Sequence, residues 1–289
     1  MTTGNLFKIL FYILLSGFCI SCTHETILSP IDYVDPFIGT GFHGHTYPGA
    51  TVPYGAVQLS PDTRRDNWDA CSGYHYSDTT IIGFSHTHLS GTGCIDLGDI
   101  LFHPTTKDIH PVKEGYIYQP LAFSHKDEKA SPGYYTVKFP DEGIYAELTT
   151  TTYTGVHRYT YDKGKNRDLI IDMAHLLEDE KIDMVSIRQT GTNEISGMRR
   201  TQGWVLNQYV YFVAQFSTDF KSIDFVNDGK IQLQDGSLNQ QAVLHFGLSD
   251  GTPIIAKVGI SIVSEENARE NLQTETSGFD FDAIYAQTR

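Results

Sequence analysis

The second half of the chain alternates short runs of β-forming residues with tight-turn sequences. Ten runs rich in Val, Ile, Thr, Tyr and Phe are strand candidates: residues 134–139, 144–152, 156–161, 169–173, 183–187, 194–200, 209–216, 230–234, 242–246 and 254–261. Turn sequences ending in glycine stand between many of them, at 141–143, 162–164, 227–229, 235–236 and 250–251. Glycine suits hairpin turns because it tolerates positive φ. Since no helical pattern separates the runs, they predict antiparallel sheets stacked as a sandwich.

Residues 263–289 depart from this pattern. Ser264 can cap a helix, and a second helical pattern begins at Phe281. The second pattern has no stop signal before the sequence ends. We therefore expect an all-β, antiparallel and supersandwich-like domain over residues 33–262, followed by a short C-terminal helical linker that leads toward a domain absent from these 289 residues.

The first 21 residues have the features of an export signal. Lys8 precedes an apolar run over residues 9–20, which is too short to span a membrane. A small serine then precedes Cys22, as in the processing box of bacterial lipoproteins. We expect removal of residues 1–21, lipidation of Cys22, a tether over residues 22–32, and anchoring to the outer membrane on its periplasmic or surface side. The alternative is ordinary cleavage, which leaves a periplasmic protein.

The charge of the chain excludes one class of partner. The formal net charge is −14, and loss of Lys8 with the signal takes it to −15. Nucleic acids and anionic membrane surfaces need clustered Lys and Arg, so neither is an expected partner. A Gly-x-Gly-x-x-Gly match over residues 39–44 is followed by Pro48 and Gly49 rather than by a helix, which argues against a dinucleotide site.

Histidines and glycines concentrate between Tyr33 and Pro104. Two His-x-His pairs lie there, His43 with His45 and His86 with His88. On extended backbone both rings of such a pair leave the same face, so the pairs are candidate zinc or di-metal ligands. The carboxylates that would complete such a site are Asp69, Asp96 and Asp99. Alternatively, these histidines tie the glycine-rich loops together through hydrogen bonds.

The same stretch contains two further candidates for chemistry. A glycosidase needs two carboxylates across the scissile bond, but Asp96 and Asp99 are three residues apart in a glycine-rich turn and are interpreted as hydrogen-bond acceptors of the loop. Cys71 and Cys94 are the cysteines left for the exported domain. Their spacing leaves a disulfide and a free Cys71 that lines a pocket equally open.

Taken together, these motifs resemble the opening signature of glycoside hydrolase family 92, the bacterial exo-acting α-mannosidases. The similarity is long and specific through residues 39–55, 59–64, 68–78 and 83–99, and it extends more weakly as far as Arg269. One small departure is Tyr54-Gly55-Ala56, where the family more often has Phe and Met.

The resemblance implies an N-terminal β-sandwich that packs against a larger helical-barrel domain. In the family the catalytic acid, the base and the calcium ligands lie in the helical part, and water attacks with inversion. This implies no catalytic residue and no metal ligand in the present chain. The implied function is the pocket-forming domain of a calcium-dependent exo-α-mannosidase, typically α-1,2, acting on mannose-rich N-glycans and inactive without a helical domain in cis or on a separate chain.

Carried over residue by residue, the resemblance places Trp68 and Asp69 against the terminal mannose. The same wall of the pocket would be lined by Cys71, Gly91, Thr92 and Gly93. Support of the pocket or of the domain interface would fall to His43, His45, His86, His88 and Arg64. Two alternatives remain: a stand-alone carbohydrate-binding lipoprotein, and a metal-dependent hydrolase built on the His-x-His pairs.

Overall fold

The computed structural model describes residues 29–109, 118–177, 181–227, 230–232 and 240–288. The predicted signal, its cleavage site and lipidation at Cys22 lie outside these residues. The chain divides into two units, Met1–Tyr33 and Val34–Arg289. In the described part of the first unit, η1 (Pro30–Tyr33) begins after Ser29, whose N–H donates to Asp32 Oδ2 at 2.9 Å. Among the described residues, no helix has the length and apolarity needed to cross a membrane.

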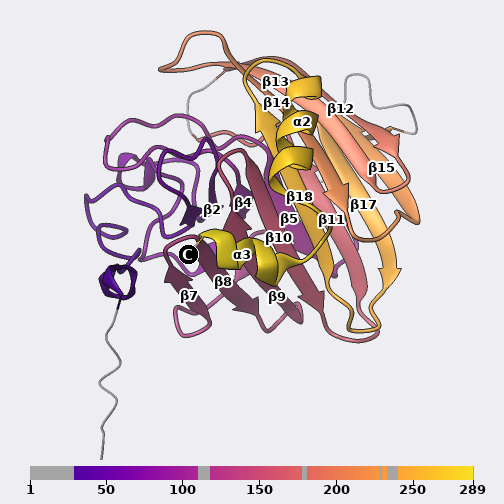
Figure 1. Ribbon diagram of the computed structural model, residues 1–289, viewed down its shortest axis with the longest axis horizontal. Coiled ribbons are helices and arrows are strands. Elements are labelled where there is room, and N and C mark those ends of the chain that lie inside the picture. The colour runs from indigo at the N-terminus through magenta and orange to yellow at the C-terminus, as the bar shows by residue number, and fades with distance from the viewer. Residues whose placement is uncertain (1–28, 110–117, 178–180, 228–229, 233–239, 289) are drawn as a thin grey trace, which may run out of the picture. The chain divides into compact units, whose positions relative to one another are not determined.

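Two antiparallel sheets of eight strands each form the second unit (Figure 1). In spatial order, the first sheet contains β1 (Ala50–Thr51), β2 (Gln58–Asp62), β4 (Gly83–Ser85), β5 (Leu101–Thr105), β11 (Asn166–Asp172), β17 (Gln241–Leu248), β15 (Ser222–Asn227) and β16 (Lys230–Gln232). The second contains β12 (Lys181–Gly191), β13 (Glu194–Gln202), β14 (Gln208–Phe216), β18 (Ile254–Ser261), β10 (Thr154–Tyr161), β9 (Ile144–Thr150), β8 (Tyr134–Phe139) and β7 (Glu128–Ser131). A small pair joins β3 (Thr80–Ile81) to β6 (Leu121–Ala122). The predicted all-β sandwich is confirmed.

The predicted glycines lie in turns between strands: Gly143 in the β8–β9 hairpin, and Gly164 and Gly251 where the chain crosses from one sheet to the other. Gly143, Gly164 and Gly251 have φ values of 67°, 79° and 95°. Side chains would be strained at these φ values, which explains the glycine in each turn. Each of the ten predicted runs overlaps an observed strand, although 233–234 lie outside the described residues. The predicted turns at 227–229 and 235–236 lie partly or wholly outside them.

Aromatic side chains from both sheets fill the space between the layers. Phe84 and Phe102 of the first sheet meet Tyr159 and Phe216 of the second, and all four are fully buried. The Phe84 and Tyr159 ring centroids are 6.2 Å apart, and those of Phe102 and Phe216 are 6.3 Å apart. Burial of each such side chain contributes roughly 1.5–3 kcal/mol. This shared core makes the sandwich one body.

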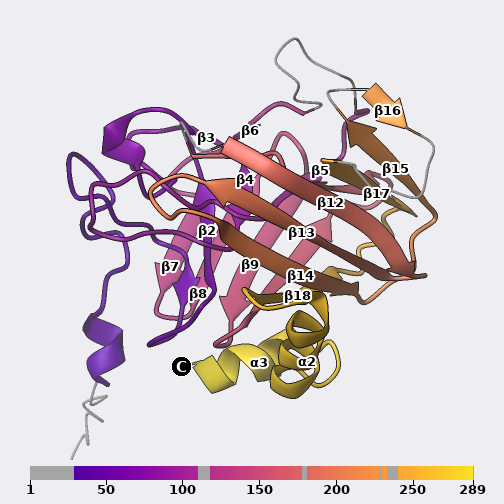
Figure 2. The same cartoon turned by 90° about the horizontal axis from the view of Figure 1, so that it is seen from above.

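Two helices, α2 (Glu265–Glu275) and α3 (Phe281–Thr288), pack on the outer face of the second sheet (Figure 2). The Ser264 side chain accepts a hydrogen bond from Asn267 N–H and so caps α2, as the sequence predicts. Helix α2 approaches β18 closely at Gly259, where a Cβ would lie 2.3 Å from Ala268 O. Glycine is therefore required at this crossing.

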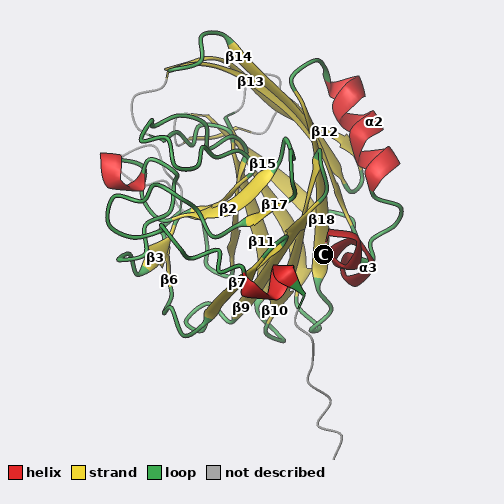
Figure 3. Ribbon diagram, turned by 60° about the vertical axis from the view of Figure 1, so that its left-hand side comes forward, coloured by secondary structure: helices red, strands yellow, loops and turns green. Residues whose placement is uncertain are grey.

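Long loops fill most of the chain between Val34 and Ile100. They include η2 (Trp68–Ala70) and only short strands. Figure 3 shows these loops, drawn in green, gathered on one side of the strands. The predicted site residues before position 100 lie on these loops or in the strands directly beneath them.

Candidate functional site

Trp68 stands at the start of η2 with its side chain half exposed. Asn67 caps this turn, since its side chain accepts from Asp69 N–H at 2.9 Å. The indole Nε1–H donates to Gly93 O at 2.8 Å, and the His45 ring packs edge-on against the indole at 4.1 Å. The side chain remains 50% exposed. The indole is thus fixed in orientation while half of its surface faces solvent.

Asp69 and His43 form a pair beside the indole. His43 Nδ1 lies 2.5 Å from Asp69 Oδ1, and the two side chains are 54% and 32% exposed. The His43 ring centroid is 5.5 Å from that of Trp68. An aromatic face, an imidazole and a carboxylate therefore lie side by side at the surface.

His45 joins two of the loops beneath this surface. Its carbonyl accepts from Gly91 N–H at 2.6 Å, and a Cβ on Gly93 would lie 3.3 Å from its Nδ1. The side chain is 8% exposed, and Nε2 is buried without a hydrogen-bond partner among the described residues. His45 therefore links its own loop to the turn at residues 91–93, beside the Trp68 indole.

Other predicted site residues lie close to this centre. The Arg64 guanidinium pairs with Asp78, whose carboxylate also accepts from Thr63 Oγ1 at 2.6 Å, and this pins the loop that carries η2. Cys71 N–H donates to Trp68 O at 3.2 Å, and burial raises the pKa of the Cys71 thiol. The Thr92 hydroxyl accepts from Cys94 N–H at 3.2 Å.

Both cysteines of the described domain are free thiols in the structure.

Strained backbone concentrates in these loops. Among the described residues, non-glycine residues with positive φ are Phe42, His45, Tyr54, Asn67, Leu97, Ile100 and Asn207. All but the last fall between positions 42 and 100, in the loop-rich part of the chain. Bulky residues rarely adopt this conformation, and such strain clusters at functional sites.

His86 lies between the sheets rather than at the loop surface. His86 Nδ1–H donates to Ile100 O at 2.7 Å, so its Nε2 accepts from His157 Nε2–H at 3.0 Å. His157 Nδ1 in turn accepts from Tyr159 O–H at 2.8 Å. With both rings neutral, as their burial favours, this is the one assignment of protons that satisfies the chain. Burial lowers the pKa of His86 to about 4 and that of His157 well below its usual value.

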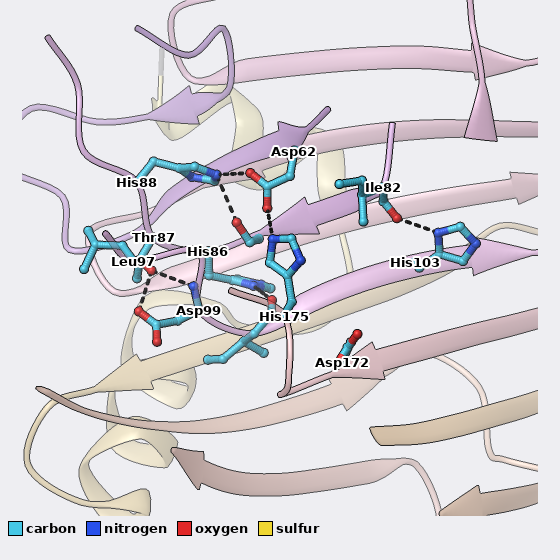
Figure 4. Close-up of polar contacts among 12 residues, drawn as sticks. Asp62, Ile82, His86, Thr87, His88, Leu97, Asp99, His103, Asp172 and His175 are labelled. Atoms are coloured by element: carbon cyan, nitrogen blue, oxygen red, sulfur yellow. Dashed lines mark hydrogen bonds and ion pairs between the residues drawn. The ribbon is translucent and has the colours of Figure 1, made fainter. Parts of the chain in front are cut away.

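His88 belongs to a second buried network, centred on Asp62 (Figure 4). His88 Nδ1 faces Gln58 O at 2.7 Å and Nε2 faces Asp62 Oδ1 at 2.7 Å, so both ring nitrogens donate. His175 Nε2 donates to Asp62 Oδ2 at 2.8 Å. Burial would raise the pKa of Asp62, but the His88 charge and the hydrogen bonds from both histidines outweigh it and hold that pKa well below its usual range.

The two carboxylates of the glycine-rich turn are buried acceptors, as interpreted from the sequence. Asp99 accepts from Arg199 Nε at 2.5 Å, from Thr87 Oγ1 at 2.6 Å and from Gln208 Nε2 at 2.8 Å. Asp96 Oδ2 accepts from Val205 N–H at 2.9 Å, which ties the loop to the turn between β13 and β14. Both carboxylates are almost fully buried, with exposures of 1% for Asp96 and 0% for Asp99.

A metal site does not fit the residues that the structure describes. Within them, no group of three His, Cys, Asp or Glu side chains could hold a metal ion. The ring nitrogens of His86 and His88 already face protein partners in two separate networks. The buried oxygens of Asp62, Asp96 and Asp99 accept hydrogen bonds from protein donors. Such side chains suit structural networks better than Zn²⁺ or Ca²⁺ coordination.

Comparison with protein families decides the classification. The model of the glycosyl hydrolase family 92 N-terminal domain matches residues 33–261. The chain belongs to this family. The resemblance read from the loop motifs is thereby confirmed for this GH92 N-terminal domain, and so is its fold.

Solved and curated relatives are considerably longer. A GH92 α-mannosidase from Bacteroides thetaiotaomicron, solved in complex with mannoimidazole, is 36% identical with a TM-score of 0.83 over 89% of this chain and 36% of its own. A GH92 inverting mannosidase from the same organism is 25% identical with a TM-score of 0.76, over 90% and 35%. An uncharacterized secreted glycosidase of Arthroderma benhamiae is 24% identical over 86% of this chain and 35% of its own length. The GH92 N-terminal domain thus spans about a third of these relatives.

The structure brings some predicted residues of the GH92 domain together and separates others. Trp68, Asp69 and His43 form one cluster at the surface, and His45 and Gly93 contact the indole within it. His86 and His88 lie behind it, in the interior. The interior partners that the sequence analysis missed are Asp62, His157, His175 and Arg199. Asp62 lies within the 59–64 motif, but its pairing with His88 and His175 was not predicted, since these partners are 26 and 113 residues away in the chain.

Proposed function

We propose that the chain is the N-terminal, substrate-binding part of a calcium-dependent, inverting exo-α-mannosidase acting on α-1,2-linked mannose of mannose-rich N-glycans. Family membership and the 36% identical α-mannosidase that holds mannoimidazole support this proposal. The observation that carries it is the half-exposed indole of Trp68 beside the carboxylate of Asp69.

The geometry suits one terminal sugar. The apolar C–H face of a pyranose stacks on an exposed indole. Asp69 Oδ1 is held by His43, and the remaining lone pairs of the carboxylate accept sugar hydroxyls. The turn formed by Gly91, Thr92 and Gly93 then lines the same wall, and Cys71, only 1% exposed, supports it from beneath the surface. A neutral sugar is compatible with the acidic chain, whose net charge is −14.

The chemical step belongs to a helical domain of the full-length protein. That domain would supply the acid, the base and the calcium ligands, because Asp62, Asp96 and Asp99 are buried acceptors. It would be present in cis or on a separate chain. The described residues nevertheless contain every side chain of the Trp68 cluster, which also favours the second candidate, a carbohydrate-binding lipoprotein that acts alone.

Tryptophan fluorescence tests the sugar site directly. The sequence holds two tryptophans, Trp68 and Trp204, and Trp204 is 66% exposed on the turn between β13 and β14. In Trp204→Phe, Trp68 is the single indole and reports on its own surroundings. Titration of this variant with methyl α-mannoside should shift the Trp68 emission. The affinity obtained from that shift should equal that of the wild-type chain. Trp68→Ala should weaken binding measured by calorimetry at least about tenfold.

Trp204→Phe serves as the matched control, because it removes an exposed indole outside the cluster. Unchanged calorimetric affinity in Trp68→Ala, or equal losses in both variants, would contradict the proposed site. Failure of the wild-type chain to bind any α-mannoside would remove the carbohydrate-binding function itself.

Export and lipid anchoring complete the proposal. The curated relative from Arthroderma benhamiae is described as secreted. Cys22, as the acylated first residue, would hold the domain at the outer membrane, periplasmic or surface-facing. In a bacterial host, Cys22→Ser should move the chain from the detergent-soluble membrane fraction to the soluble periplasm. An unchanged distribution of the variant between the two fractions would refute lipidation.

An apolar surface marks where the helical domain would dock. A cavity of about 750 Å³ is lined by Tyr153, Val205, Ile262 and Val263, among other residues. Ile262 and Val263 are 78% and 70% exposed in the turn before α2. Clustered exposed aliphatic side chains typically mark an interface, and the matched relatives are about three times as long as the domain matched here. We infer that the helical domain covers this surface.

A further inference from the structure

Phe42 occupies a turn position that normally requires glycine. Gly44 N–H donates to Gly41 O at 3.3 Å, which makes Phe42 the second residue of a four-residue turn. Its φ is 58°. Turns with positive φ at this position favour Gly, Asn or Asp, because a bulky side chain is strained there. The same loop does have glycine at a crowded position, since a Cβ on Gly44 would lie 2.1 Å from Gly39 O.

Burial does not compensate for this strain. The Phe42 side chain is 81% exposed. The backbone is nevertheless held in place, because His75 Nε2 lies 3.2 Å from Phe42 O while His75 Nδ1 accepts from Ser77 N–H at 3.2 Å. A large apolar ring is thus presented to solvent from a fixed, strained turn. Such a combination is typical of a binding surface.

The Phe42 ring continues the aromatic row of the site. Its centroid lies 4.5 Å from that of His43, which in turn lies 5.5 Å from that of Trp68. The centroids of the Phe42 and Trp68 rings are therefore no farther apart than the sum of these two distances, so one disaccharide can reach both rings. His43 stands between them and is fixed by Asp69.

We propose that Phe42 is a stacking platform for the second sugar of an α-mannoside whose terminal unit lies on Trp68. This proposal rests on the proposed function, and it adds a specificity-determining residue to the same site. A phenyl face offers the second sugar the same apolar contact that the indole offers the first. Phe42 thereby favours a disaccharide over a monosaccharide.

Calorimetry with two ligands tests the platform on the purified chain. The wild type should bind α-1,2-mannobiose more tightly than methyl α-mannoside. Phe42→Gly should weaken mannobiose binding about three- to tenfold and leave the monosaccharide affinity unchanged. It should also raise Tm by about 1–3 °C, because glycine relieves the positive φ. Phe42→Tyr keeps the ring and should retain the wild-type ratio of affinities.

Tyr54 offers a matched control. It is another fully exposed aromatic residue at positive φ, with φ 60°. Tyr54→Gly should raise Tm in the same way and leave both sugar affinities unchanged.

Three outcomes would overturn the platform. The first is that Phe42→Gly retains the mannobiose affinity of the wild type. The second is that Phe42→Gly lowers the affinities for mannobiose and for the monosaccharide equally. Equal effects of Phe42→Gly and Tyr54→Gly on mannobiose binding would also refute it. If the wild type binds mannoside but shows any of these results, the platform alone fails. If the wild type binds neither ligand, both the proposed function and the platform are refuted.

Discussion

At the scale of single residues, the site depends on polar side chains buried behind it. His86, His157 and Tyr159 form one directed chain of hydrogen bonds inside the sandwich. Buried polar groups are tolerated when every donor finds an acceptor, and here each ring nitrogen has a partner. The first of the two His-x-His pairs presents His43 to solvent, whereas the second is wholly internal. The same sequence motif therefore serves two different physical roles.

Acid should destabilise the fold through these buried histidines. Burial lowers the pKa of His86 and of His103 to about 4, and that of His157 well below its usual value. These rings are neutral in the folded state and titrate near pH 6.5 in the unfolded state. Their contribution to folding stability is therefore fully present above pH 6.5 and is lost as the pH falls toward 4. Each of these histidines lowers the free energy of unfolding by up to about 1.4 kcal/mol for every pH unit below 6.5. Urea unfolding at pH 7, 6 and 5 measures the loss.

Two variants separate this effect from general acid sensitivity. His157→Phe removes one titrating ring, so its stability should fall less steeply between pH 7 and 5, although it starts about 1–3 kcal/mol lower because two partners lose a hydrogen bond. Hydrogen bonds to Asp168 and Asp224 raise the pKa of His245, so its contribution is lost above pH 6.5 instead. His245→Gln should change the profile only above pH 6.5. If the free energy of unfolding of His157→Phe falls as steeply below pH 6.5 as that of the wild type, His157 does not cause the acid sensitivity.

At the scale of elements, the sequence predicts the regular half of the molecule better than the loops. Strands such as β8 and β18 appear where the β-forming runs predict them, because alternation and glycine turns are local signals. Strand β15 was not predicted, and neither were the strands before residue 131. Several of these are only two or three residues long, and their pairing depends on neighbours distant in the chain.

The candidate site was predictable only in part, and for the same reason. The motifs place Trp68, Asp69 and the turn at residues 91–93 in one region, and the structure brings them into contact. Asp99 and Arg199 are 100 residues apart and carry no shared pattern, so their buried ion pair is visible only in three dimensions. The strain at Phe42 is likewise a property of the turn conformation rather than of the residue type.

At the scale of the whole molecule, the GH92 N-terminal domain should bind mannosides without cleaving them. A glycosidase needs two carboxylates flanking the scissile bond, one of them protonated. Of the carboxylates near the site, Asp69 pairs with His43, and Asp62, Asp96 and Asp99 are at most 1% exposed. We expect no free mannose from α-1,2-mannobiose with calcium, although the same sample binds the sugar. Mannose release by the wild type that is lost in Trp68→Ala would contradict this expectation.

If the proposed docking surface is correct, it should determine whether cleavage can be restored. A helical domain supplied as a separate chain should seat against Val205, Ile262 and Val263 and bring its acid and base to the sugar on Trp68. Mannose should then be released from mannobiose. Val263→Asp places a charge on this surface, 70% exposed in the chain alone, so it should leave folding and mannoside binding intact while abolishing that release. Undiminished release from Val263→Asp would show that the helical domain docks elsewhere.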